Sequence, residues 1–142
     1  MVQMSRELRQ AVHQAILCAK SAAKIQQLIS DFGPASDGVF REEIKMASQA
    51  AYAASAHAWI AMLAMASNSV DVAQNAAQAA CDAERIIVAF AESTLLLDLN
   101  IGQDHELAYS LPNEQELYHL WDEFCRSLPS GFPVPDSFDE RL

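Results

Sequence analysis

The chain has 142 residues, the usual length of one domain and enough for a single sizeable core. Its four glycines and five prolines are too few for a collagen-like or disordered chain, or for a β sandwich with many turns. Nineteen acidic against nine basic residues give a formal charge of −10, which disfavours direct binding to nucleic-acid phosphates. We therefore expect an acidic, all-α domain.

The first half of the chain predicts two long helices. Apolar residues at spacings of three and four predict the first over residues 5–32. Gly33-Pro34 should end it, because glycine suits a left-handed cap and proline cannot continue a helix. The second is expected to begin at residue 37 or 38, with Asp37 as the N-cap, and to reach about residue 67.

A third helix is predicted over residues 70–99, after a Ser67-Asn68-Ser69 turn. Alanine dominates one side of it, where we expect Ala73, Ala76, Ala77, Ala80, Ala83, Ile87, Ala91 and Leu95. Because alanine lets backbones approach closely, the second and third helices should form an antiparallel hairpin. Their bulky residues should then fill space against the first and last helices: Tyr52, Trp59, Ile60, Met62, Leu63, Ile86, Ile87, Val88 and Phe90.

The last predicted helix is short and covers residues 114–127. Asn113 and Glu116 have the spacing of a capping box at its start. Its buried stripe should consist of Leu117, Leu120, Trp121, Phe124 and Leu128. Residues 129–142 contain three prolines and should form an irregular tail that lies along the bundle. The expected fold is thus an antiparallel bundle of three long helices with a short C-terminal helix, a single domain over residues 1–128 followed by the tail.

The cysteines and the apolar stretches indicate the compartment. Cys18, Cys81 and Cys125 lie far apart without any Cys-x-x-Cys pair, so we expect reduced thiols in a cytoplasmic protein. The start of the sequence lacks the pattern of a secretion signal. Residues 46–70 carry no charge and are long enough to span a bilayer, but their many serines, amides and His57 favour a buried central helix.

The sequence contains little that suggests an enzyme. It has no glycine-rich phosphate loop, no Gly-x-Ser-x-Gly motif and no His-Glu-x-x-His motif. Glu116 and His119 have the spacing of a metal-ligand pair on one helical face, but a di-iron bundle needs two such pairs and two further glutamates. We therefore expect a non-enzymatic protein without a metal or other cofactor, and keep a helical metal protein as an alternative.

The charge is distributed unevenly along the chain. Residues 1–71 carry six bases and six acids, whereas residues 72–142 carry three bases and thirteen acids. Aromatic residues accompany these acids: Tyr109, Tyr118, Trp121, Phe132 and Phe138. Acids beside aromatics are typical of a surface that binds a basic protein, although acidity can also serve solubility alone. The expected partner-binding residues are Asp104, Glu106, Glu114, Glu116, Asp122, Glu123, Asp136, Asp139 and Glu140.

Two runs, AAYAASAHAW at residues 50–59 and AAQAACDAERII at residues 76–87, resemble the alanine-rich immunity proteins of bacterial polymorphic-toxin systems. The resemblance implies a helical cytoplasmic antitoxin that blocks one cognate toxin. Together with the charge, it favours an inhibitor of a basic, nucleic-acid-acting protein, with no direct nucleic-acid or membrane partner. Besides the metal protein, two other functions stay open: a phage-encoded inhibitor of a nucleic-acid-guided bacterial defence complex, and a secretion chaperone or structural adaptor. The alanine faces also leave open a homodimer.

Overall fold

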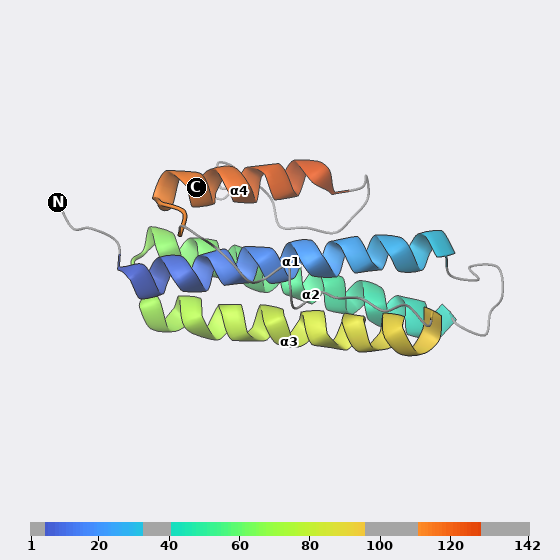
Figure 1. Ribbon diagram of the computed structural model, residues 1–142. Helices are drawn as coiled ribbons and strands as arrows, with labels where there is room; N and C mark the ends of the chain where they lie inside the picture. The colour runs from blue at the N-terminus through green and yellow to red at the C-terminus, as the bar shows by residue number, and fades with distance from the viewer. Residues whose placement is uncertain (1–4, 33–40, 96–110, 129–142) are drawn as a thin grey trace.

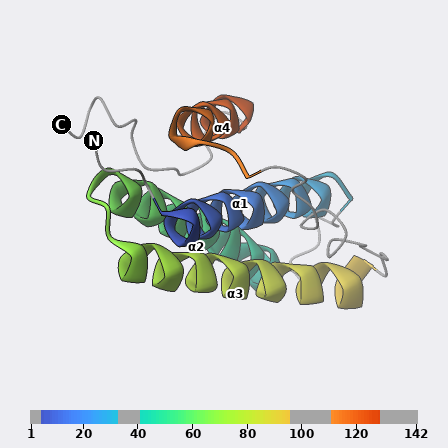
Figure 2. The same ribbon diagram turned by 60° about the vertical axis from the view of Figure 1, so that its left-hand side comes forward.

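The computed structural model describes residues 5–32, 41–95 and 111–128, and all regular structure in these ranges is helical. The three long helices are α1 (Arg6–Phe32), α2 (Arg41–Ala66) and α3 (Val70–Leu95), and the short one is α4 (Glu114–Ser127). The long helices run up, down and up, so that α1 and α3 are parallel and α2 is antiparallel to both (Figure 1). α4 lies against α1, on the side away from α3 (Figures 1 and 2). The all-α prediction is therefore confirmed.

The helix boundaries agree closely with the sequence. α1 begins one residue after the predicted start, α2 ends one residue before its predicted end, and α3 begins at the predicted Val70. The bounds of α4 are those predicted. Four predictions concern residues outside the described ranges: the stop at Gly33-Pro34, the N-cap Asp37, the last turn of the third helix, and the tail at 129–142.

The turn between α2 and α3 is a Schellman motif built on Asn68. Its φ of 56° lies in the left-handed region, which asparagine tolerates better than most residues. The Ser69 amide donates to the Ala64 carbonyl at 2.8 Å, and the Asn68 amide donates to the Met65 carbonyl at 3.1 Å. These bonds satisfy carbonyls at the end of α2 and reverse the chain into α3.

Small side chains form much of the core between the three long helices. The alanines predicted for the inner side of α3 are buried, together with Ile87, and they face buried alanines of α1 and α2. Larger side chains of α1 are buried in the same core, among them Leu8, Ile16 and Ile25. The alanine content of the chain is thus explained by close helix packing.

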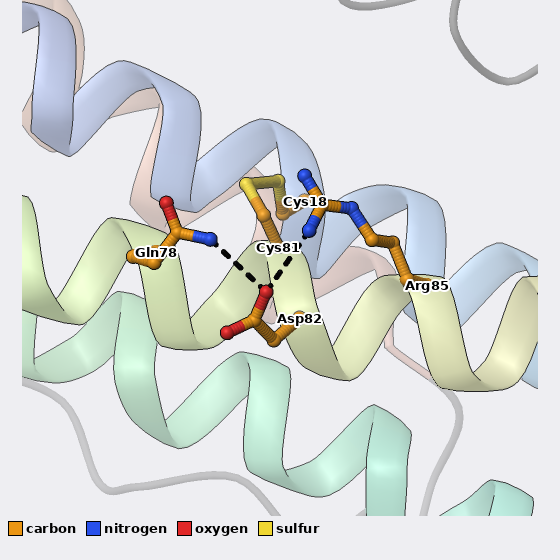
Figure 3. A network of polar contacts seen from close by, with 5 residues as sticks. All are labelled: Cys18, Gln78, Cys81, Asp82 and Arg85. Atoms are coloured by element: carbon orange, nitrogen blue, oxygen red, sulfur yellow. Dashed lines mark hydrogen bonds and ion pairs between the residues drawn. A yellow bond between two sulfur atoms is a disulfide. The ribbon is translucent and has the colours of Figure 1, made fainter.

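One expectation about the cysteines is wrong: Cys18 of α1 and Cys81 of α3 form a disulfide (Figure 3). They are separated by 63 residues in the sequence, but the parallel packing of α1 and α3 brings their Cα atoms to 5.3 Å, within the range that a disulfide bridges. Both side chains are buried among the alanines. Sequence spacing gave no sign of this pair because the two residues meet only through the fold.

The bulky residues of α2 and α3 do not all fill the core as expected. Trp59, Met62 and Ile87 are buried. Four others, however, are 39–58% exposed: Tyr52, Ile60, Leu63 and Ile86. Ile86 is exposed because α4 lies on the side of the bundle away from α3 (Figures 1 and 2). The three residues of α2 were misassigned because alanine occupies nearly every face of that helix, so its periodicity does not show which side is buried. None of the described helices is long and apolar enough to cross a membrane.

Candidate functional site

The start of α4 is fixed by the predicted capping box. The Asn113 side chain accepts a hydrogen bond from the Glu116 amide at 2.8 Å, and the Asn113 amide donates to the Glu116 carboxylate at 2.9 Å. Two backbone donors that a helix start leaves open are thereby satisfied. Pro112, one residue earlier, accepts a hydrogen bond from the Arg9 guanidinium of α1 at 3.3 Å. The first turn of α4 is therefore stabilised by its own capping box, and the residue before it is hydrogen-bonded to α1.

The inner side of α4 is anchored by three buried side chains, Leu117, Trp121 and Phe124. The Trp121 ring stacks on Trp59 of α2 with centroids 5.9 Å apart, and Phe124 lies 5.5 Å from Trp121. The prediction that Trp121 belongs to the buried stripe of this helix is confirmed, so its ring does not add to the surface beside the acids. Its indole N–H is buried and donates no hydrogen bond within the described part of the chain.

The exposed surface of α4 carries four of the nine predicted partner-binding acids. All four are exposed, and we call them the acidic face of α4: Glu114, Glu116, Asp122 and Glu123. With Arg126 as the one basic residue of the helix, α4 has a formal charge of −3 when His119 is neutral. The other five predicted acids lie outside the described residues: Asp104, Glu106, Asp136, Asp139 and Glu140.

Two acids of this face have partners within α4. Asp122 pairs with Arg126 at 3.1 Å. Glu123 lies 3.0 Å from the His119 ring, and the two form an ion pair only when His119 is protonated. All four side chains are more than half exposed, and such pairs contribute only about 0.3–0.5 kcal/mol. A partner that offers better cations can therefore displace them at little cost.

Burial and nearby carboxylates raise the pKa of two side chains of α4, Tyr118 and Cys125. Burial raises the pKa of Tyr118, and the charge of Glu114 raises it further. Cys125 behaves in the same way: burial raises the pKa of its thiol, and Asp122 adds to the rise. Cys125 is the one free cysteine, and it stays a protonated, weakly nucleophilic thiol near neutral pH.

The acids of α3 belong to a different surface. α3 carries four acids and Arg85, and it lies on the side of the bundle away from α4 (Figure 1). Asp82 accepts a hydrogen bond from Gln78 at 3.0 Å and pairs with Arg85 at 3.1 Å, which forms a local network beside the disulfide (Figure 3). Glu84 is buried. The described acids of the second half thus form two separate surfaces, and only the one on α4 contains predicted site residues.

The Glu116–His119 spacing does not assemble a metal site in the described part of the chain. Glu116 is occupied by the capping box, and His119 is paired with Glu123. No group of three or more potential metal ligands occurs among the residues described.

Sequence reasoning missed two features of the structure. One is the disulfide; the other is a groove between α1 and the C-terminal end of α4, beside Lys20 and Lys24. The one available signal for the groove was the presence of two lysines a single helical turn apart in an acidic chain. Comparison with protein-family models, with curated proteins and with solved structures finds no match to this chain.

Proposed function

We propose that the protein is an inhibitor that binds one basic, nucleic-acid-acting protein through the acidic face of α4, in the manner of the immunity proteins it resembles. The observation that carries this proposal is the exposure of four carboxylates on a helix whose inner side is locked into the core. A helix held in this way presents its charges without a large loss of conformational entropy on binding.

Charge complementarity gives such a surface its function. A negative face attracts a basic partner during diffusion and speeds the encounter, and it disfavours acidic proteins. An enzyme that acts on nucleic acid holds phosphates with cationic side chains. Carboxylates on a rigid helix can contact the same cations and so block the site. A phage-encoded inhibitor of a nucleic-acid-guided complex would use this surface in the same way.

The test of this proposal compares two charge reversals of equal size. One variant combines Glu114→Lys and Glu123→Lys on α4, and the control combines Asp71→Lys and Glu92→Lys, both exposed on α3. Each pair removes one first-turn acid and one later acid, so effects on helix stability are matched. The partner is first captured from the native cell with the unaltered chain, identified and purified.

The dissociation constant of that complex is then measured for each variant. We expect the α4 variant to bind at least about tenfold more weakly, while the α3 control changes affinity by much less. If both pairs weakened binding equally, overall charge alone would cause the effect and the acidic face of α4 would not be the binding surface. If the α4 pair did not weaken binding, the proposal would be refuted.

A second candidate function rests on the apolar residues exposed on α2 and α3. Tyr52, Ile60 and Leu63 are exposed on an uncharged stretch of α2, and an exposed apolar surface can bind an apolar segment of another protein. This observation favours a secretion chaperone or structural adaptor. If so, Ile60→Glu combined with Leu63→Glu abolishes capture of the partner, and the α4 charge reversal leaves it intact.

The location of the protein is also part of the proposal. A nucleic-acid-acting partner favours the cytoplasm, where thiols are kept reduced, whereas the Cys18–Cys81 bond favours an oxidising compartment. Trapping of thiols with a maleimide during lysis of the native cell distinguishes the two. A cytoplasmic protein would carry the label on all three cysteines after denaturation, and an oxidised one on Cys125 alone.

A further inference from the structure

A groove of about 750 Å³ lies between α1 and the C-terminal end of α4. Its volume is within the range of about 300–1,000 Å³ that is typical of small-molecule sites. Leu17 and Leu28 line it from α1, and Phe124 and Leu128 line it from the end of α4. Along α1 the lining extends over three helical turns, or about 16 Å. The groove is thus elongated and largely apolar.

The charge of the groove is opposite to that of the chain. Lys20 and Lys24 line it one helical turn apart, and no acidic residue is among the described residues of its wall. Neither lysine forms an ion pair within the ranges that the structure describes. α1 carries four bases and two acids, whereas the whole chain has a net charge of −10. A ligand that combines an anionic group with an apolar body matches this lining.

We propose that the groove binds a single-chain aliphatic carboxylate, a ligand of the fatty-acid class. Its carboxylate would lie between the Lys20 and Lys24 ammonium groups, and its chain would contact the leucines and Phe124. Burial of the methylene groups supplies the driving force, and the two lysines select an anion over a cation.

The size of the groove favours such a ligand over a helix of a protein partner. A helix about 10 Å in diameter and about 16 Å long occupies roughly 1,250 Å³, so the groove would hold it only in part. A single aliphatic chain fits within the volume observed. None of the four acids of the acidic face of α4 is among the residues that line the groove.

The test uses the full chain and titration calorimetry with two probes of equal chain length. Dodecanoate carries the carboxylate, and dodecyltrimethylammonium carries a cation in its place. We expect dodecanoate to bind with one molecule per chain and the cationic probe to bind at least about tenfold more weakly. The double variant Lys20→Gln, Lys24→Gln should weaken dodecanoate binding about tenfold, because two partly exposed ion pairs are lost.

Two further variants make the result specific to the groove. Arg6→Gln combined with Lys45→Gln removes the same charge from exposed residues outside the groove, and it should leave dodecanoate binding unchanged. Ala23→Phe places a ring in the groove wall and should abolish binding while it keeps both lysines.

The proposal is overturned if dodecanoate does not bind, if both probes bind equally, or if the lysine variant and its control behave alike. It is likewise overturned if an acidic amphipathic peptide binds in a lysine-dependent way and dodecanoate does not, since the occupant would then be a protein segment.

Discussion

Single residues of α4 show where chemical type predicted the role of a side chain and where it did not. Asn113 and Glu116 were expected to cap the helix, and they do so. Trp121 was predicted both in the buried stripe of the helix and among the aromatics beside the acids, and it stacks on Trp59 in the core. An aromatic ring can serve in a core or at an interface, and only the packing around it decides which. The four described acids of the predicted surface are exposed, whereas Glu84 of α3 is buried.

His13 should make stability depend on pH. Burial lowers the pKa of this histidine, and the nearby charge of Lys20 lowers it further. The unfolded chain therefore binds a proton more readily than the folded one. The difference in proton binding stabilises the folded state above the usual histidine pKa of about 6.5. This stabilisation is lost as the pH falls from there through the lowered pKa of the folded chain.

Urea unfolding at about pH 7.5 and at about pH 5.5 measures this effect. From the higher pH to the lower, the free energy of unfolding of the unaltered chain should fall more than that of the variant His13→Gln. Parallel losses in the two proteins would show that other groups cause the pH dependence.

At the scale of helices, the sequence predicted lengths and ends well but not every buried face. The stripes of α1 and α3 were read correctly because polar residues mark their outer sides. α2 has alanine on nearly every face, so its periodicity does not show which side is buried. Tyr52, Ile60 and Leu63 were therefore assigned to the core and lie at the surface.

The cap of α4 allows a direct test at this scale. Replacement of Asn113 by alanine removes the acceptor for the Glu116 amide and should lower the free energy of unfolding by about 1 kcal/mol. Gln115→Ala, at an exposed residue in the same turn, serves as the control and should change it by less than about 0.5 kcal/mol. Denaturant titration measures both, and an equal response would mean that the cap adds nothing to stability.

For the whole molecule, the main surprise is the covalent link between α1 and α3. The all-α bundle could be predicted because each helix carries its own signal, whereas the disulfide arises from how two helices pack. The prediction of one acidic surface had the same limit. A count of acids over half the sequence does not reveal that α3 and α4 lie on opposite sides of the bundle (Figure 1).

Reduction of the Cys18–Cys81 bond should destabilise the protein. The bond closes a loop of about 63 residues, for which loss of chain entropy in the unfolded state gives at most about 4 kcal/mol. Unfolding in urea with and without a reductant measures the difference. The variant Cys125→Ala, which keeps the bond, should show the same loss on reduction, and an unchanged midpoint in both proteins would mean that the link does not contribute to stability.

The central claim is that the acidic face of α4 attracts a basic partner. The most direct measurement is the association rate constant of the purified complex at ionic strengths of about 0.01 M and about 0.15 M, by stopped flow. We expect the rate constant to fall at least about tenfold between these conditions, and to fall far less for the variant Glu114→Lys, Glu123→Lys. A rate constant that is the same at both ionic strengths, or that depends on salt equally in the variant, would contradict the claim.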